Sequence, residues 1–541
     1  MNFRPLSPPD GLFVLDDTSP GFQRARPIDS GRLVWDSKQT RIVLRAESPH
    51  RLAVSLSSGE PVRRVVLRWK HRVAPCVRIL GDAWERTYGD IEWRGPSPHR
   101  LLPWYFLATE GSETAGWGVE TGARALACWR VDVDGITLEL DVRSGGAGVV
   151  LGSRTLEAVT IIDRPSQPGE TPFAATCALC RDLSPAPLMP RESVVGHNDW
   201  YWLYGKNSAQ VILDATRRLL DIYPTGSGVP RPWSVIDDGW EVSVYEAAHE
   251  CPGGPWQQSN GKFPDMAAVA ADIKSLGARP GIWMRPLCTY ASVPDEWKLP
   301  KQGPVAPTGG HRLDPSVPAV LELVREDIAC LRDWGYELIK HDFSTYDASG
   351  RWGFEMQAKD GFTADGWAFA DRTRTTAEIL LDLYRTIRKE AGPEVLILGC
   401  NTVSHLAAGL VEIQRTGDDT SASDWDRTRR MGVNTLAFRA AQQGSFYAVD
   451  ADCVPISPQI PWRLTEAWLK LVASSGTPLF LSIDPSECGP EQTAALKAAL
   501  KTASKPGPVA EPLDWLDTPV PSRWKLSGRE EQFEWSEWDI R

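Results

Sequence analysis

The sequence lacks the features that define several large classes of protein. No apolar run is long enough to span a bilayer, so we expect no membrane partner. The formal net charge of −11, from 59 Lys and Arg against 70 Asp and Glu, argues against a nucleic-acid partner, because phosphate binding requires a basic surface. The N-terminus MNFRPLSPPDGLFVLDD has no basic region followed by an apolar core, so we expect no secretory signal.

A cysteine framework is also lacking. The ten cysteines are scattered, and Cys177 and Cys180 form the one C-x-x-C pair, with no second pair to complete a zinc site. This usage is typical of reduced cysteines and predicts a cytoplasmic protein, although processing of a precursor is left open.

The length of 541 residues exceeds that of one ordinary hydrophobic core and predicts two or three domains. Up to about Pro190 the sequence carries short alternating or apolar runs separated by Gly, Ser and Pro, such as RRVVLRWKHRV and LEAVTIIDR. This pattern predicts an N-terminal antiparallel β-sandwich over residues 1–190. The proline-rich stretch Ser184 to Ser193 is the expected linker.

The pattern changes after this linker. Apolar runs beginning at Val194, Pro232, Arg279, Tyr336, Val395, Leu410, Ser445 and Thr477 alternate with amphipathic stretches such as SAQVILDATRRLLDIY. Repeated strand–helix units predict an α/β fold, a (β/α)8 TIM barrel over residues 191–505. A doubly wound open sheet is the alternative, but no G-x-G-x-x-G follows the first strand. Residues 506–541 leave room for a short, curtailed C-terminal β segment.

Polar residues recur where the predicted barrel strands end. In chain order they are Asp237 and Asp238, Trp283 and Arg285, Lys340 and Asp342, Cys400 and Asn401, Arg415 with Asp418 and Asp419, and Asp450 and Asp452. The carboxyl ends of barrel strands converge on one face, where active sites are built. The pattern therefore predicts a polar functional pocket at that face.

The stretch YELIKHDF places two charges at the end of an apolar run. Side chains alternate along a strand, so Lys340 and Asp342 share a face, and the ammonium would keep the carboxylate ionised. Such a carboxylate, with a second one as general acid, suits glycoside hydrolysis. A structural ion pair is the alternative reading of the same two residues.

Other chemistries find less support in the sequence. The first barrel strand carries His197-Asn198-Asp199 rather than the H-x-H of metal-dependent barrel hydrolases, and we expect no catalytic metal. No G-x-S-x-G elbow is present. Cys400 lies at a strand end but has no evident base, so we expect it to line the pocket rather than act as a nucleophile.

Taken in order, IDDGW after the second strand, K-x-D after the fourth and R-x-x-x-D after the sixth resemble the melibiase-type α-galactosidase clan, glycoside hydrolase families 27 and 36. The N-terminal sandwich is closer to family 36. The resemblance covers most of the chain. It implies that Asp342 is the nucleophile and Asp419 the acid/base, with Asp418 as the second choice. It also implies that Lys340 contacts sugar hydroxyls.

The resemblance assigns further residues to substrate binding. Asp237 and Asp238 match the paired aspartates that hold the 4- and 6-hydroxyls, Arg415 is the motif arginine, and Trp283 matches the GIW of the third strand. Asp452 resembles an acidic residue at the rim. The predicted substrate-binding residues also include Arg285, Cys400, Asn401, Trp200 and Trp84.

Two departures from the family pattern bear on specificity. Met284 and Arg285 replace the acidic residues expected after GIW, and GCNTVSH replaces the C-S-G-G near the 2-position of the sugar. Cys400 is kept but the glycines are not, which leaves the sugar open. In the family, a loop of the N-terminal domain donates an aromatic residue to the barrel mouth. Gly81 to Trp93 is the candidate segment here, with a sandwich edge loop as the alternative.

The resemblance implies a retaining exo-acting α-glycosidase, an α-galactosidase first, that needs no cofactor and takes an oligosaccharide or other α-glycoside. A transglycosylase, or an enzyme for an α-N-acetylgalactosaminide, an α-glucoside or a β-L-arabinopyranoside, stays open. So do a non-catalytic carbohydrate-binding barrel and a homo-oligomer. The 24 tryptophans fit sugar stacking, but such residues are more often structural.

Overall fold

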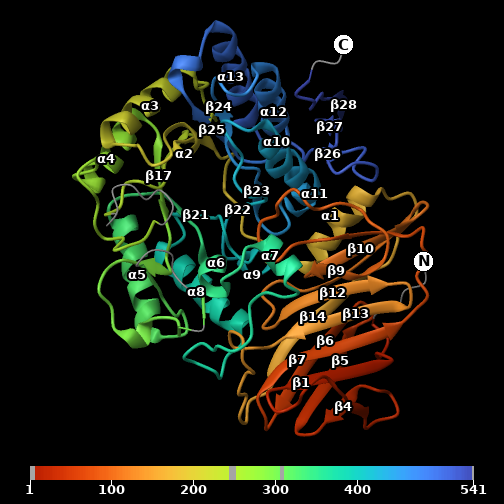
Figure 1. Cartoon of the computed structure of the whole chain (residues 1–541). Helices are drawn as coiled ribbons and strands as arrows, with labels where there is room; N and C mark the ends of the chain where they lie inside the picture. The colour runs from red at the N-terminus through yellow and green to blue at the C-terminus, as the bar shows by residue number, and fades with distance from the viewer. Residues whose placement is uncertain (1–5, 243–251, 302, 305–309, 539–541) are drawn as a thin grey trace.

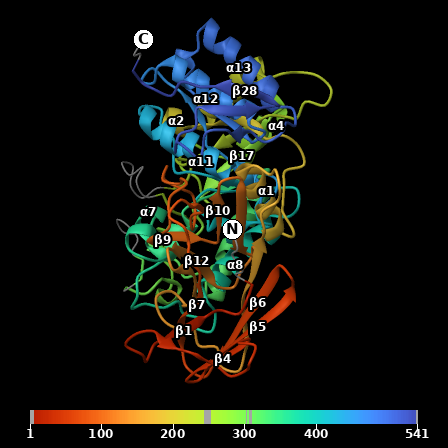
Figure 2. The same cartoon turned by 90° about the vertical axis from the view of Figure 1, so that its right-hand side faces the viewer.

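The computed structural model describes residues 6–242, 252–301, 303–304 and 310–538. Residues 1–5, at the start of the predicted first domain, and residues 539–541, at the end of the predicted third domain, lie outside the described residues. Figures 1 and 2 show an elongated molecule, with strands β4, β5 and β6 at one end and helices α12 and α13 at the other.

Residues 11–164 form a sandwich of two antiparallel sheets, as predicted. One sheet has the order β2 (Gln23–Arg24), β1 (Gly11–Asp16), β7 (Val62–Lys70), β13 (Gly135–Asp141), β12 (Leu126–Asp132) and β9 (Ser97–Pro103). The other has the order β3 (Arg26–Pro27), β4 (Val34–Ser37), β5 (Thr40–Ser48), β6 (Arg51–Ser58), β14 (Leu156–Arg164), β11 (Glu113–Val119), β10 (Tyr105–Glu110) and β8 (Arg78–Gly81). In β7 the period of two buries Val65, Leu67 and Trp69, while Val66 and Arg68 between them stay partly exposed.

Helix α1 (Pro172–Leu183) joins the sandwich to the barrel and was not among the predicted elements. Thr171 caps its first turn through Ala174 N. The helix lies against β11, where a Cβ on Gly116 would approach Leu179 to 2.7 Å. Glycine is therefore required in β11 for this close approach. Residues 185–194 then lead to the barrel without a helix or strand.

A parallel sheet forms the barrel and confirms the predicted fold. Its order is β23 (Ala448–Asp450), β22 (Ile413–Arg415), β21 (Leu396–Gly399), β20 (Leu338–His341), β17 (Arg279–Met284), β16 (Trp233–Ile236), β15 (Val195–Asn198), β25 (Leu479–Ile483) and β24 (Val454–Ile456). β23 lies within the predicted seventh run SFYAVDADC, which begins at Ser445, and β24 follows directly after that run. They are separated around Asp452, whose φ is 71°, so β23 pairs with β22 while β24 pairs with β25.

Helices surround this sheet (Figure 1). The longer ones are α3 (Ala209–Ile222), α4 (Met266–Leu276), α5 (Pro318–Asp333), α8 (Thr376–Ala391), α12 (Trp462–Ser474) and α13 (Pro490–Ala503). Shorter ones are α2 (Trp200–Leu203), α6 (Ser344–Ser349), α7 (Gly353–Ala358), α9 (Ser404–Ala407), α10 (Trp425–Thr428) and α11 (Thr435–Arg439), with a π-helical turn over Arg429–Asn434. Thr375 and Glu378 form a capping box that starts α8 where the sequence pattern placed it.

The C-terminal segment adds a small antiparallel sheet of β26 (Glu511–Pro512), β27 (Arg523–Leu526) and β28 (Arg529–Gln532), in agreement with the short β segment expected. Trp524 of β27 is fully buried and anchors this sheet. A hairpin β18 (Cys288–Thr289) with β19 (His311–Arg312) follows the third barrel strand. Over the described residues, every helix is too short or too polar to cross a bilayer.

Candidate active site

The fourth barrel strand presents Lys340 and Asp342 on one face, as the sequence alternation predicts. Strand β20 ends at His341, and the Asp342 N–H still donates to Met284 O of β17 at 2.9 Å. The ring of His341 lies 5.9 Å from that of Tyr384 in α8, on the helix side of the strand. The register of β20 therefore directs both charged side chains away from the helix layer.

Lys340 pairs with Asp237 rather than with its strand neighbour. Its Nζ lies 2.7 Å from Asp237 Oδ2, and Asn198 Nδ2 donates to the same oxygen at 2.6 Å. Burial opposes the charge of Lys340, but Asp237 outweighs it and raises the pKa of the ammonium well above its usual value. The alternative reading, a structural ion pair of Lys340 with Asp342, is thus wrong, because Asp237, just after β16, supplies the carboxylate that pairs with Lys340.

Asp342 is buried and held at both oxygens. Phe343 N donates to Oδ1 at 2.7 Å, and Trp283 Nε1 lies 3.3 Å from Oδ2. Burial favours the protonated carboxyl, but the positive charges of Arg86 and then Lys340 outweigh it, so the pKa of Asp342 lies below its usual value. Asp342 is therefore ionised at neutral pH, as a nucleophile must be.

Arg415, the last residue of β22, connects three other predicted site residues. Its guanidinium lies 3.1 Å from Asp419, 2.9 Å from Asp452 and 3.5 Å from Cys400 Sγ. Burial would raise the pKa of Asp419, but Arg415, Arg86 and Lys340 lower it to about 2. Asp419 is consequently a carboxylate in this arrangement.

Asp452 is saturated by protein partners. It accepts hydrogen bonds from Thr420 N at 2.8 Å and from the hydroxyl of Tyr201, in addition to its pair with Arg415. Only 3% of the residue is exposed. Asp452 therefore anchors Arg415, and its expected role at the rim stays a prediction. Tyr201 was missed, since nothing in the run DWYW distinguishes its role.

The segment Gly81 to Trp93 reaches the barrel, as one of its two readings predicted. Thr87 N donates to Thr416 O at 2.9 Å, and Asp418 N donates to Thr87 O at 2.8 Å. The side chain that enters the site is Arg86, whose Nη2 lies 2.9 Å from Asp418 Oδ1. The expected aromatic donor is thus replaced by a guanidinium.

The contacts of Asp418 distinguish it from Asp419. Asp418 is held between Arg86 and Arg427, whose Nη2 lies 2.7 Å from Oδ2. Its side chain is 16% exposed, against 35% for Asp419. A carboxylate enclosed by two guanidinium groups is poorly placed to exchange protons with a ligand, so the geometry favours Asp419 over Asp418 as the acid/base candidate.

A group of buried carboxyls follows β15 and β16. Asp199 Oδ1 accepts from Asp237 N at 2.7 Å. Burial, together with the charge of Asp237, raises the pKa of Asp199 to about 7. Burial and the neighbouring Glu241 raise the pKa of Asp238 well above its usual value. Protonated carboxyls are therefore present at neutral pH, and these can donate hydrogen bonds to hydroxyl groups.

Three of the predicted substrate contacts have close protein partners, and their role toward a substrate stays a prediction. Arg285 forms a buried ion pair with Asp347, with Nη2 2.6 Å from Oδ1. Asn401 donates from Nδ2 to Glu85, and its Oδ1 accepts from Tyr346 N at 2.9 Å. The ring of Trp84 packs on Trp104 and Phe362, at 5.2 and 6.0 Å between centroids. Each side chain is used in packing or ion pairing, which sequence position alone does not reveal.

Two further candidates keep their predicted assignments as predictions. Trp200 begins α2, is half-buried and meets Tyr204 edge to face at 5.5 Å. Burial and the nearby charge of Asp342 raise the pKa of the Cys400 thiol well above its usual value, so it is not a thiolate nucleophile. The thiol instead hydrogen-bonds to Asp342.

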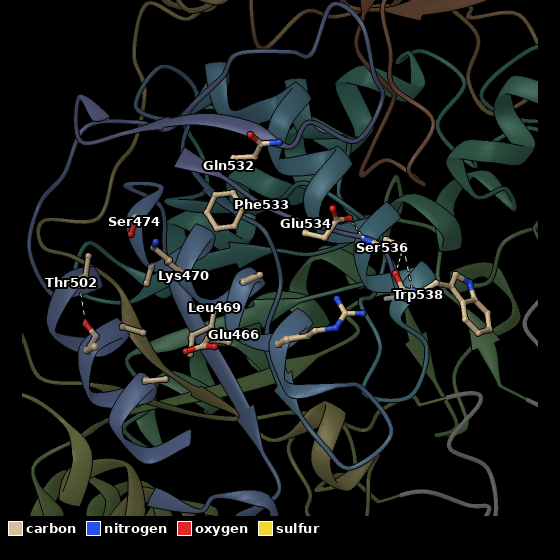
Figure 3. A pocket seen from close by; sticks show the side chains of 16 residues that line it. Glu466, Leu469, Lys470, Ser474, Thr502, Gln532, Phe533, Glu534, Ser536 and Trp538 are labelled. Atoms are coloured by element: carbon tan, nitrogen blue, oxygen red, sulfur yellow. Dashed lines mark hydrogen bonds between the residues drawn. The ribbon is translucent and has the colours of Figure 1, made fainter. Parts of the chain in front are cut away.

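A separate groove of about 990 Å³ lies at the C-terminal end of the molecule (Figure 3). Residues of α12, α13 and the segment after β28 line it, among them Lys470, Thr502, Phe533 and Trp538. None of the predicted site residues lines this groove. The candidate active site is therefore the barrel mouth and not this groove.

No family model matches the chain. The fold is similar to that of solved α-galactosidases. TtGalA from Thermus thermophilus, in complex with p-nitrophenyl α-D-galactopyranoside, is 18% identical with a TM-score of 0.60 over 91% of this chain and 97% of that one. GH36 AgaA from Geobacillus stearothermophilus is 14% identical with a TM-score of 0.60 over 91% and 75%. The galactosidase domain of the α-galactosidase-sucrose kinase AgaSK gives 15% and 0.55 over 89% and 68%.

Proposed function

We propose that the chain is a retaining exo-acting α-glycosidase, with an α-galactoside as its first candidate substrate. The observation that carries the proposal is the pairing of Asp342 and Asp419. Both are carboxylates at the ends of barrel strands, and Arg86 and Lys340 lower the pKa of each. Two carboxyl groups at the same end of the barrel are what retaining glycoside hydrolysis requires.

In the first step, an Asp342 oxygen bonds to the anomeric carbon, and the bond from that carbon to the leaving oxygen breaks. The leaving oxygen takes a proton from Asp419. In the second step, water gives a proton to Asp419 as its oxygen attacks the anomeric carbon, and the bond to Asp342 breaks. Two inversions give net retention, and no cofactor takes part.

The charge of Asp342 changes the pKa of Asp419 between the two steps, and this change lets Asp419 act first as acid and then as base. Asp419 raises the pKa of Asp342, and by reciprocity Asp342 raises that of Asp419 while both are ionised. Esterification of Asp342 removes its negative charge and thereby lowers the pKa of Asp419. Asp419 is then ionised and can act as the base in the second step. Before the first step, Arg415 and Arg86 oppose protonation of Asp419. A bound substrate must therefore exclude water from Asp419 and so raise its pKa, because desolvation favours the protonated carboxyl.

Support for a galactoside comes from the acid cluster and from the similar structures. Asp237 is fixed by Lys340 and Asn198, and Asp238 follows it at the end of β16, where the family resemblance puts the 4- and 6-hydroxyls. The Thermus thermophilus enzyme is in complex with an aryl α-galactoside.

The test is activity on aryl α-galactosides by the wild type, Asp342→Gly and Asp419→Gly. We expect wild-type turnover, near-complete loss in both variants, and rescue of Asp342→Gly by azide with a β-glycosyl azide as product. Rescue of Asp419→Gly should give the α-azide. Wild-type rates in both variants would contradict the assignment of Asp342 as nucleophile and Asp419 as acid/base.

A different sugar is the second candidate, and the fifth strand motivates it. Asn401 is bound to Glu85 and Tyr346, so Cys400 is the residue of GCNTVSH that faces the carboxylates. A panel of aryl α-glycosides, including the α-N-acetylgalactosaminide and the α-glucoside, decides between sugars. Product analysis at high acceptor concentration separates hydrolysis from transglycosylation. A chain that turns over no glycoside but binds sugar in calorimetry would be the non-catalytic barrel.

We also propose the division into residues 1–190, 191–505 and 506–541, and a cytoplasmic location. The absence of helix and strand over residues 185–194 supports the first boundary, and limited proteolysis there would test it. The nine cysteines among the described residues are free thiols, which suits a reducing compartment. Fractionation of the source cells would test the location.

A further inference from the structure

Arg86 belongs to the sandwich but lies among barrel side chains. It is 6% exposed, and its guanidinium lies 2.9 Å from Asp418 and 3.7 Å from Asp419. It also lies 3.6 Å from Cys400 Sγ. A buried guanidinium is costly unless it is paired, so its place between these groups is specified by the fold.

The loop that carries Arg86 is fixed on both sides of it. Glu85 Oε1 accepts from Gly353 N at 2.7 Å, and Glu85 Oε2 accepts from Asn401 Nδ2. After Arg86, Thr87 forms a parallel bridge with Gly417 through its backbone. The guanidinium itself lies over the ring of Trp352, 5.2 Å from the centroid. These contacts leave Arg86 little freedom to leave the carboxylates.

Other charges also face the two carboxylates. Several groups surround Asp419. They are Arg86 of the loop, Arg415 of β22, Lys340 and Asp342 at the end of β20, Tyr201 of α2, Tyr204 just after α2, and Arg427 of α10, which donates to the Asp419 carbonyl. Those around Asp342 are Arg86, Lys340, Asp419 and the thiol of Cys400. Arg86 and Lys340 are the cations common to both, and Lys340 is already paired with Asp237.

We propose that Arg86 is a positioning residue that the N-terminal sandwich contributes to the barrel, where its guanidinium orients Asp419 and sets the charge of the Asp342–Asp419 pair. The inference rests on the proposed function of that pair. It assigns the sandwich loop a part in the chemistry, through electrostatics rather than through a stacking contact with the sugar.

The experiment compares the wild type, Arg86→Gln and Arg86→Lys in the full chain. Removal of a cation raises the pKa of a neighbouring carboxyl, so both limbs of the kcat/KM profile of Arg86→Gln should move to higher pH, by about one unit or more. Arg86→Lys should restore much of this shift because it keeps the charge. Compared at the pH optimum of each protein, the loss of kcat/KM should be at least about tenfold larger for an alkyl α-glycoside than for the matching aryl glycoside, because Asp419 is no longer oriented toward the leaving oxygen and the alkyl leaving group needs its proton.

Tyr88→Phe is the matched control for the loop. The Tyr88 hydroxyl hydrogen-bonds to Glu85 at 2.5 Å and lies in the same segment, but it carries no positive charge. This variant should keep the wild-type limb positions. An equal loss for both substrates in Arg86→Gln, with unmoved limbs, would assign Arg86 a structural role and overturn the proposal.

A readout without substrate separates this inference from the proposed function. In protein labelled with [4-13C]aspartate, the resonance missing from Asp419→Asn identifies Asp419, and its titration can be followed in each variant. We expect it to titrate at higher pH in Arg86→Gln than in the wild type. Identical titration in both would overturn the inference whatever the substrate. A shifted titration in a chain inactive on every glycoside would refute the function alone.

Discussion

Lys340 Nζ lies 2.7 Å from Asp237 Oδ2. The positive charge near the end of the fourth barrel strand is therefore neutralised by the carboxylate that follows the second barrel strand. Both side chains are buried, and Asn198 shares the same carboxylate oxygen. The pair fixes one wall of the barrel mouth before any ligand arrives, because neither charge can leave its partner without a large desolvation cost.

Breaking this pair should be destabilising from either side. Lys340→Met leaves Asp237 buried and unpaired, and Asp237→Asn leaves Lys340 in the same state, so each should lower the free energy of unfolding by about 3–5 kcal/mol. The double variant should recover part of that loss. Urea unfolding of the four proteins measures the coupling. Strictly additive losses would show that the two groups do not interact.

The pH dependence of activity should have an acidic optimum. The pKa of Asp419 is lowered to about 2 and that of Asp342 is also lowered, so both limbs of kcat/KM lie toward low pH. Above the second pKa the proton needed by the leaving group is lost, and activity on alkyl glycosides should fall steadily as pH rises. Initial rates from pH 3 to 9 test this. A profile centred above pH 8 would contradict the charge arrangement.

Glu85 should make stability fall as pH rises. Burial raises its pKa to about 7 from 4.5, so the folded state binds a proton that the unfolded state releases. The stabilisation is complete below about pH 4.5 and is lost as pH rises toward 7, a change of about 3 kcal/mol. Relative to the wild type, Glu85→Gln should therefore gain stability between pH 4 and pH 8.

The measurement for Glu85 is chemical unfolding of both proteins at several pH values. The informative quantity is the difference between them, because other buried carboxyls such as Asp199 and Asp450, with pKa values raised by burial to about 7 and about 6, contribute to both curves. A difference that stays constant with pH would mean that Glu85 is ionised in the folded protein.

Arg285 should affect stability more than substrate affinity. Its guanidinium is committed to Asp347, so Arg285→Gln leaves a buried carboxylate without its closest partner and should cost about 3–5 kcal/mol. Arg312, with Nε 3.3 Å from the same carboxylate, should keep part of the site intact. KM of the folded fraction should change little. A large rise in KM without loss of stability would restore Arg285 to the sugar site.

Much of the fold followed from patterning. Period-two alternation in β7 and the capping box of α8 placed those elements, and the recurring strand–helix units gave the barrel. Helix α1 was missed because it lies in a segment read as β, where its role depends on the glycines of β11. The seventh strand was read as continuous, since the positive φ of Asp452 has no signature in the letters DADC.

For the candidate site too, the sequence predicted some features and did not reveal others. The order of motifs along the chain predicted Asp342, Lys340, Arg415 and Asp419 as site residues, and the structure places all four at or just after the ends of barrel strands. Asn401, Arg285 and Trp84 occupy equally suggestive positions. Their partners Glu85, Asp347 and Trp104 come from other segments, and the sequence does not reveal these contacts.

The sequence by itself determined the architecture and the residue types that gather at the mouth, since hydrophobic periodicity and strand-end polarity are local properties. The tertiary structure alone decided which charge meets which. Lys340 lies beside Asp237 and Arg86 beside Asp418 and Asp419, across separations of 103 and more than 300 residues. The ionisation of Asp342 and Asp419 depends on distances between charges in a buried, weakly screened site, and those distances exist only once the sandwich loop has docked on the barrel.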